Sequence, residues 1–119
     1  MTARFERVAP VLPVRDLDAA LELYRRLGFS VRAFEGDARY GFCERGQVSL
    51  HLSEVAGLDP ATSVVSLYLD VDDADAVHDE WRAAGVEGSF HEPEDTGYEL
   101  REFAYVDPDG NLLRVGSPL

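Results

Sequence analysis

Three histidines and one cysteine are the side chains of this sequence best suited to hold a metal ion or to act as a nucleophile: His51, His78, His91 and Cys43. A metal site needs several such groups to converge on one point, and a nucleophile needs an activating base or cation beside it. Cys43 is instead followed by Glu44, whose negative charge would raise the pKa of the thiol. We therefore expect Cys43 to be a small apolar filler of the core.

The sequence pattern does not bring the three histidines together. His51 lies on the polar face of an alternating strand, so its ring could enter a binding cleft. His78 falls within a predicted helix, where a surface position or a packing role is the simplest interpretation. His91 begins an acidic segment, 91–95, for which a metal site is conceivable but a solvated loop is the more common outcome.

Aromatic side chains offer a second kind of chemistry, the stacking of flat ligands. Phe34, Tyr40 and Phe42 cluster in two predicted strands of the first half of the chain, and Tyr68 falls in a strand of the second half. Aromatic rings give a large apolar contact area and a face on which a cation can sit. Each ring could equally belong to the core, where such side chains are often buried.

The elements that must position these residues follow an internal repeat. The segments 14–19 and 24–29 correspond to 71–76 and 81–86 at a constant offset of 57 residues. In both copies an aspartate precedes a helical pattern, and a glycine ends it. An offset of about half the chain predicts two copies of one structural unit.

The first copy reads as a strand, a helix and three further strands. Apolar residues over 8–14 predict the first strand, Asp16 is the expected N-cap of the helix, and Gly28 ends it. The apolar helix face consists of Leu17, Ala20, Leu21, Tyr24 and Leu27. The three later strands are expected over 30–34, 40–44 and 48–53.

The second copy has the same order of elements. A strand over 64–71 precedes the N-cap Asp73, and Gly85 ends the helix, whose apolar face consists of Ala74, Val77, Trp81 and Ala84. Weaker strand signals cover 88–91, 100–106 and 112–116. Between the last two strands, the sequence Asp107-Pro108-Asp109-Gly110 predicts a tight turn.

These patterns predict an α+β fold in which residues 1–119 form a single domain. A first βαβββ module covers about 5–54, a linker about 54–62 and a second module about 63–117. A helix on one face of each sheet leaves the other face concave, and two such faces opposite each other would enclose a cleft.

Charge narrows the class of partner. The chain has 119 residues, with 23 Asp and Glu against 11 Arg, and a net charge of −12. Such a surface repels nucleic acid and anionic membranes and attracts cations. No apolar run approaches the roughly 20 residues of a membrane helix, and the N-terminus lacks the apolar core of a signal peptide. With a single cysteine, these features favour a cytoplasmic protein.

The sequence resembles the vicinal oxygen chelate superfamily, which includes glyoxalase I, extradiol dioxygenases, fosfomycin-resistance enzymes and bleomycin-resistance proteins. The resemblance covers nearly the whole chain, and the segments 48–53, 76–81 and 101–103 look most like the bleomycin-resistance branch. It implies a domain-swapped homodimer, in which the first module of one chain closes against the second module of its partner and two clefts form. The motifs that carry it are Val14-Arg15-Asp16-Leu17, residues 23–29, Arg101-Glu102-Phe103 and Asp107-Pro108-Asp109-Gly110-Asn111.

Enzymes of this superfamily hold one divalent metal through His, Glu or Gln side chains, and the metal acts as a Lewis acid. Counted from the motifs, the corresponding positions in this chain are Ala9, Ser66 and Arg114. Ala9 has no donor atom, neutral Ser66 is a poor ligand, and Arg114 is a cation with no lone pair to offer. We therefore expect no metal and no cofactor.

The resemblance also implies a groove lined by aromatic side chains. Bleomycin binders typically carry a Trp-Gly pair where this chain has Glu99 and Leu100. Arg114 would bring a positive charge into the groove, which indicates an anionic or carbonyl-bearing ligand group or a structural ion pair, unless Asp70 neutralises it. The predicted ligand-binding residues are Phe34, Tyr40, Phe42, His51, Ser53, Ser66, Tyr68, Tyr98, Glu99 and Arg114.

Three functions remain open from the sequence. The first is a metal-free homodimeric protein that sequesters a cationic, aromatic antibiotic such as bleomycin, which carries a cationic tail and flat bithiazole rings. The second is a lyase, isomerase or dioxygenase of the same superfamily, with a displaced metal or with acid–base chemistry from His51 and Glu99. The third is a binding module for another metabolite.

Overall fold

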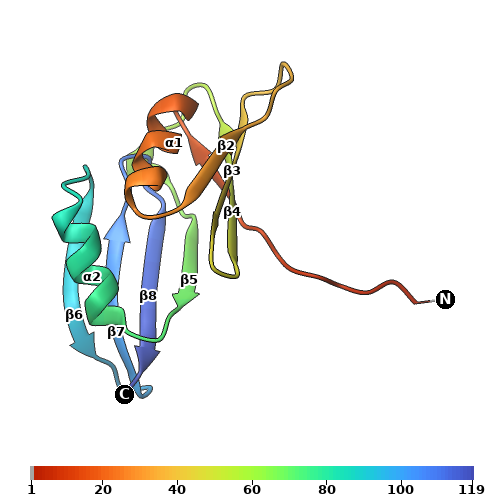
Figure 1. Cartoon of the computed structure of the whole chain (residues 1–119). Helices are drawn as coiled ribbons and strands as arrows, with labels where there is room; N and C mark the ends of the chain where they lie inside the picture. Colours follow the sequence, from red (N-terminus) through yellow and green to blue (C-terminus); the bar gives the residue numbers. More distant parts are fainter. Residues whose placement is uncertain (1) are drawn as a thin grey trace.

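Residues 2–119 are described by a computed structural model, in which two four-stranded sheets each carry one helix (Figure 1). The first sheet has the strand order β1-β4-β3-β2, with β1 parallel to β4 and the other pairs antiparallel. Its elements are β1 (Val11–Val14), α1 (Leu17–Arg26), β2 (Ser30–Ala33), β3 (Tyr40–Arg45) and β4 (Val48–Glu54). We call this unit the first module.

The second module repeats this arrangement with the strand order β5-β8-β7-β6. A short 3₁₀ helix, η1 (Pro60–Thr62), lies in the connection between the modules. The elements that follow are β5 (Ser66–Asp70), α2 (Ala74–Ala83), β6 (Ser89–Asp95), β7 (Leu100–Val106) and β8 (Leu112–Pro118). The predicted α+β fold of two βαβββ modules is therefore confirmed.

Both helices begin and end where the sequence predicts. The Asp16 side chain accepts a hydrogen bond from the backbone N–H of Ala19, and Asp73 does the same for Ala76, which satisfies N–H groups that have no partner inside the helix. Gly28 and Gly85 follow the helices with positive φ angles of 94° and 65°. A side chain would be strained in that backbone conformation, so glycine ends each helix.

Two strands are shorter than the sequence predicts. Val8 and Val64, the expected early residues of these strands, are 83% and 93% exposed. The pairing of β1 with β4 begins at Val11, opposite His51, and the exposed residues 2–8 extend away from the body of the protein (Figure 1). Apolar residues alone do not make a strand where no neighbouring strand supplies hydrogen bonds.

The acidic segment that starts at His91 is part of a strand, and its prediction as a loop is wrong. β6 pairs with β7 through Glu94 and Asp95, with a register shift between His91 and Glu94. Pro93 lies within this irregularity, and proline, which cannot donate a backbone hydrogen bond, is tolerated in a strand at an edge or a bulge. The segment is extended because β6 lies at the edge of the second sheet and pairs with β7. The run of acidic residues in the sequence gives no sign of this pairing.

One hydrophobic core draws on both modules. It contains Leu12, Leu50 and Leu52 from the first sheet and Phe103, Leu113 and Val115 from the second. Trp81 of α2 is buried and donates a hydrogen bond from Nε1 to the carbonyl oxygen of Leu27, 3.0 Å away at the end of α1. The two helices are therefore joined at their ends as well as through the core.

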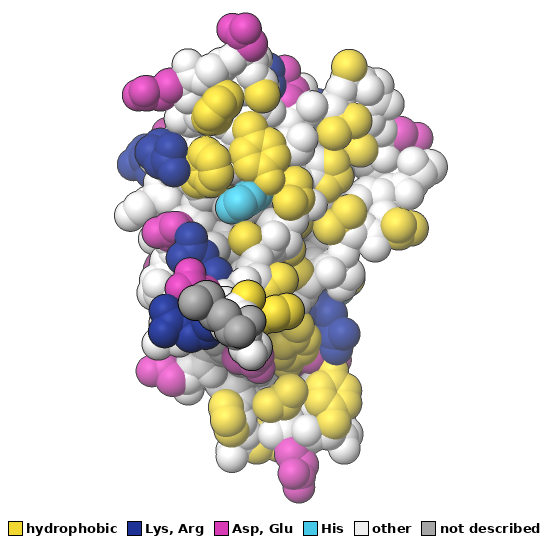
Figure 2. All heavy atoms as spheres, turned by 90° about the vertical axis from the view of Figure 1, so that its right-hand side faces the viewer, with side chains coloured by type: hydrophobic (Ala, Val, Ile, Leu, Met, Phe, Trp, Pro, Cys, Tyr) yellow, Lys and Arg dark blue, Asp and Glu magenta, His cyan; other side chains and the backbone are white. Residues whose placement is uncertain are grey.

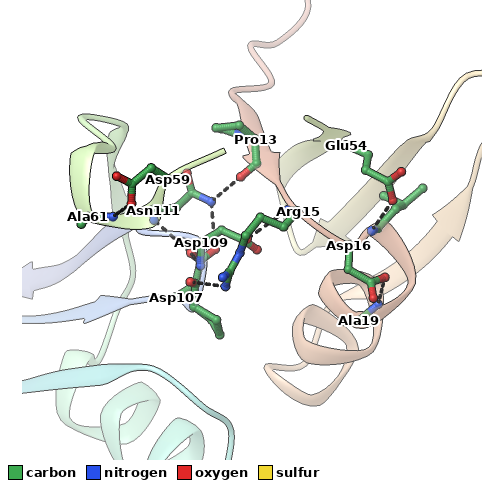
Figure 3. Close-up of polar contacts among 12 residues, drawn as sticks. Pro13, Arg15, Asp16, Ala19, Glu54, Asp59, Ala61, Asp107, Asp109 and Asn111 are labelled. Carbon is green, nitrogen blue, oxygen red and sulfur yellow. Dashed lines mark hydrogen bonds and ion pairs between the residues drawn. The ribbon is translucent and has the colours of Figure 1, made fainter. Parts of the chain in front are cut away.

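The turn between β7 and β8 holds the modules together (Figure 3). The buried Asp107 carboxylate accepts hydrogen bonds from the backbone N–H groups of Asp109 and Asn111. The side-chain amide of Asn111 donates to the carbonyl oxygen of Pro13 in β1, and Arg15 Nε lies 2.8 Å from the Asp109 carboxylate. The predicted turn is confirmed, and its polar side chains brace the end of the first strand.

Within residues 2–119, neither helix has the length and apolar character that crossing a membrane would require.

Candidate ligand-binding faces

The side of the first sheet away from α1 forms the first candidate face. Alternation along the strands places Cys43, Leu50 and Leu52 in the core and turns their neighbours outward. This first face, as we define it, consists of Val11, Pro13, Arg32, Tyr40, Phe42, His51 and Ser53. Figure 2 shows hydrophobic side chains running as a band over this side of the molecule, with one histidine among them.

Three of the predicted residues form a compact aromatic group on the first face. The ring centroids of Tyr40, Phe42 and His51 lie 5.0–5.5 Å apart, and the rings meet edge to face. The Tyr40 hydroxyl and His51 Nδ1 are 2.7 Å apart, a hydrogen bond that fixes both side chains. All three residues are half-buried, so they are supported by the fold and still present ring surface outside the core.

Arg32 and Phe34 border this group. The Arg32 guanidinium lies over the Phe42 ring, 4.2 Å from its centroid, in a cation–π contact. Phe34 follows the end of β2, is 47% exposed, and donates a backbone hydrogen bond to Tyr40. The sequence interpretation did not include Arg32. Arg32 could have been found from strand alternation, because it lies between Val31 and Ala33 in the predicted strand and must point to the opposite face from both.

The second candidate face is the side of the second sheet away from α2. Leu69, Phe103 and Val115 are buried in the core, while their neighbours along the strands point to the opposite side. This second face, as we define it, consists of Ser66, Tyr68, Asp70, Glu102, Ala104, Arg114 and Gly116. The predicted strand parity of Ser66, Tyr68 and Arg114 agrees with this placement.

A polar group at the centre of the second face joins three predicted residues, Tyr68, Tyr98 and Arg114, to Glu102, which the sequence interpretation did not include. Arg114 lies 3.2 Å from a carboxylate oxygen of Glu102, and the Tyr98 hydroxyl donates to the same oxygen over 2.7 Å. Arg114 also donates to the Tyr98 hydroxyl over 2.8 Å, and its guanidinium lies 5.2 Å from the centroid of the Tyr68 ring. The partner of Arg114 is therefore Glu102 and not Asp70.

The remaining predicted residues lie at the margins of the two faces. Ser53 pairs with Tyr40 across β4 and β3, and Ser66 is the exposed first residue of β5. Glu99 lies in the turn between β6 and β7 with a φ of 67°, a conformation that favours glycine. Its neighbour Tyr98, 53% exposed, supplies an aromatic ring at this turn, where the bleomycin-resistance pattern has a Trp-Gly pair.

The ten predicted residues do not form one enclosed site within a single chain. Cavities of about 560 and 280 Å³ lie at the junction between the modules, one beside α1 and the turn at 107–109 and the other beside Trp81. None of the ten residues lines either of these cavities. The residues are instead divided between the first face and the second face.

The positions that bind a metal in the superfamily enzymes do not fit a metal here. Ala9 precedes β1, Ser66 begins β5, and Arg114 is engaged with Glu102 on β8. A guanidinium in place of a carboxylate ligand would repel a cation. Across residues 2–119, no three His, Cys, Asp or Glu side chains are placed so that they could hold a metal ion.

Two other reactive side chains have packing roles. Cys43 is fully buried, and burial raises the pKa of its thiol to about 12, so the nucleophilic thiolate is disfavoured. His78 is buried on α2, with its ring edge to face against Phe90 and Phe103. Of the two roles predicted for His78, a surface position or a packing role, the structure shows the packing role.

Comparison with known proteins places this geometry in a family. A curated bleomycin resistance protein from Klebsiella pneumoniae is 36% identical over 116 residues, which cover 92% of this chain and 90% of that protein. The bleomycin resistance determinant encoded on the transposon Tn5 superposes with a TM-score of 0.85 at 32% identity, covering 96% of this chain and 98% of that one.

Two similar structures contain ligand. A bleomycin-binding protein complexed with bleomycin has a TM-score of 0.85 and 30% identity, covering 97% of this chain and 100% of that one. A bleomycin-binding protein from Streptomyces verticillus, complexed with copper(II)-bleomycin, has a TM-score of 0.81 and 26% identity, covering 99% and 100%. Because the family model matches residues 4–115, the chain belongs to the glyoxalase/bleomycin resistance protein/dioxygenase superfamily.

Proposed function

We propose that this protein binds a bleomycin-type antibiotic and confers resistance by sequestration, without making or breaking a covalent bond. The observation that carries the proposal is the half-buried aromatic group of Tyr40, Phe42 and His51 on the first face, in a chain 36% identical to a bleomycin resistance protein. Flat rings of a ligand can stack on such a group. Sequestration works by mass action, so the Kd must lie below the free drug concentration.

Charge supports the same ligand class. The net charge of −12 attracts a cationic drug toward the protein and speeds the encounter. Arg114, the cation at the centre of the second face, is paired with Glu102 and therefore opposes such a ligand less than a free guanidinium would. A ligand with aromatic rings and a cationic tail matches both properties.

The proposal includes a homodimer in which the first face of one chain closes against the second face of its partner. The support is geometric, because the candidate residues of one chain lie on two faces and outside the two junction cavities. Two copies related by a two-fold axis would form two equivalent clefts. Light scattering after size-exclusion chromatography should give about twice the chain mass of 13.2 kDa, and a monomer that still binds drug would contradict this part.

We propose a binding protein and not an enzyme, although the superfamily contains enzymes. The support is the donor set at the superfamily metal positions, which includes a paired arginine. Elemental analysis of the purified protein tests this. About one tightly held divalent ion per chain, or substrate turnover that a chelator abolishes, would overturn it.

The proposal treats residues 1–119 as one domain acting in the cytoplasm. The single core that draws on modules at about 5–54 and 63–117 supports the first statement. The lone cysteine, which is free and buried, is compatible with the second.

Calorimetric titration with metal-free and copper-loaded bleomycin tests the central claim directly. We expect saturable binding of both forms, and a higher inhibitory drug concentration for bacteria that express the protein. No heat at ligand concentrations of about tens of micromolar would overturn the assignment, and binding of a different metabolite in its place would favour a general binding module.

A further inference from the structure

The Glu102 carboxylate is the group on which the polar side chains of the second face converge. It lies on β7 directly opposite Gly116 of β8, and its side chain is 15% exposed. The Tyr98 hydroxyl donates to its Oε1, and Arg114 donates to both of its oxygens, at 3.2 and 3.3 Å. One partly buried carboxylate thus holds an exposed aromatic ring and a cation in place.

The neighbouring positions are small, which lets these side chains lie over the sheet. A Cβ atom at Gly116 would lie 1.9 Å from the Tyr68 hydroxyl, so the Tyr68 ring can cross this position only because it is glycine. The hydroxyl is buried beside Glu102 without a hydrogen bond of good geometry. Burial and this carboxylate together raise the pKa of Tyr68 to about 12, so the phenol stays protonated.

The charge state of Glu102 follows from its partners. Burial by itself would raise the pKa of the carboxyl group, but the hydrogen bonds from Tyr98 and Arg114 outweigh it, and the pKa is lowered. Glu102 is therefore ionised at neutral pH and cancels the charge of Arg114. In the described chain, Arg114 forms an ion pair only with Glu102, although Asp70 and Glu94 belong to the same sheet.

We propose that Glu102 is a specificity-determining residue, which neutralises Arg114 and holds the Tyr98 ring so that the second face accepts a cationic aromatic ligand. This inference rests on the proposed function, because it concerns the same binding cleft. Removal of the carboxylate charge would leave a cation beside the ligand with no counter-charge. The preference of the face for a cationic over an anionic ligand would then fall.

The test measures the Kd of metal-free bleomycin by calorimetry for three variants. Glu102→Gln, which keeps the shape but loses the charge, should weaken binding about tenfold. Arg114→Gln leaves a free carboxylate and should bind at least as tightly as the unmodified protein. Glu102→Gln combined with Arg114→Gln should return the Kd to within about threefold of it.

A purely structural role of Glu102 predicts a different pattern. In that case Glu102→Gln and the double variant would bind equally poorly, and Arg114→Gln would weaken binding as well. Circular dichroism melting curves of all variants check that each is folded. Equal Kd values for the unmodified protein and Glu102→Gln would also overturn the inference.

Two dyes separate this inference from the proposed function. The cationic dye thioflavin T and the anionic dye 1-anilinonaphthalene-8-sulfonate are both aromatic. Glu102→Gln should lower the ratio of cationic to anionic dye affinity, and the added Arg114→Gln should restore it. An unmodified protein that fails to bind bleomycin overturns the function, whereas an unchanged dye ratio overturns the role of Glu102.

Discussion

The Tyr24 hydroxyl on α1 donates a 2.7 Å hydrogen bond to the Asp107 carboxylate in the turn between β7 and β8. Both groups are buried, and 83 residues of sequence separate them. Burial raises the pKa of Asp107, although hydrogen bonds from Tyr24 and Asn111 lower it in part. The contact joins the helix of one module to the turn of the other.

Because of this contact, we expect Tyr24→Phe to lower the free energy of unfolding by an amount that depends on pH. An acid whose pKa is higher in the folded state contributes most to stability in acid, and this contribution is lost as the pH rises through the folded-state pKa. Loss of the Tyr24 donor raises that pKa further. The free energy of unfolding should therefore fall by about 1–3 kcal/mol at neutral pH, where Asp107 is ionised, and by less at an acidic pH, where it is protonated.

Urea unfolding at the two pH values measures the effect. Tyr105→Phe is the matched control. The Tyr105 hydroxyl donates to the backbone carbonyl oxygen of Glu87, and a backbone carbonyl does not titrate. Tyr105→Phe should lower the free energy of unfolding by the same amount at both pH values. Equal pH dependence of the two variants would show that Asp107 is not the responsible group.

Tyr40→Ala should weaken drug binding far more than it weakens the fold. Tyr40 is half-buried and supports Phe42 and His51 on the first face. Removal of an aromatic anchor from a binding site typically costs about tenfold or more in affinity. Calorimetry measures the Kd of the variant, and thermal melting measures its stability. The control is Phe103→Ala in the core, which should lose about 3–5 kcal/mol of stability. A similarly large loss for Tyr40→Ala would make Tyr40 a core residue.

Gly116→Ala should displace the Tyr68 ring from the second face. The added methyl group would collide with the Tyr68 hydroxyl and ring, at an expected cost of about 1–3 kcal/mol in unfolding free energy and a weaker Kd for bleomycin. In a Tyr68→Ala background the same substitution should be nearly neutral. A double-mutant cycle from urea unfolding measures this coupling, and additive effects would contradict the predicted collision.

The triple variant Ala9→His, Ser66→His and Arg114→Glu should acquire a metal site. These substitutions restore two imidazoles and a carboxylate, the donor types that bind zinc or a similar divalent ion. Dialysis against zinc followed by elemental analysis should find about one ion per chain. Arg114→Glu alone is the control and should take up none. No uptake by a folded triple variant would mean that the three positions do not meet, within a chain or between two copies.

Much of the fold could be predicted because short-range chemistry decides it. The N-cap bonds of Asp16 and Asp73 reach three residues along the chain, and the alternation of Leu50, His51 and Leu52 depends only on strand geometry. The repeat then implied two similar modules. Alternation also predicted that His51 lies on the outward face of its strand, whereas Tyr40 and Phe42 were singled out because aromatic residues cluster in the two preceding strands.

Tertiary structure decided which of these residues meet. Glu102 was visible in the sequence, but its pairing with Arg114 and Tyr98 depends on the register of β7 and β8 and on the turn at Tyr98. The acidic segment after His91 became a strand because β7 supplied its hydrogen bonds. Contacts between distant segments depend on the relative placement of whole elements, whereas local periodicity specifies only the face on which each residue lies.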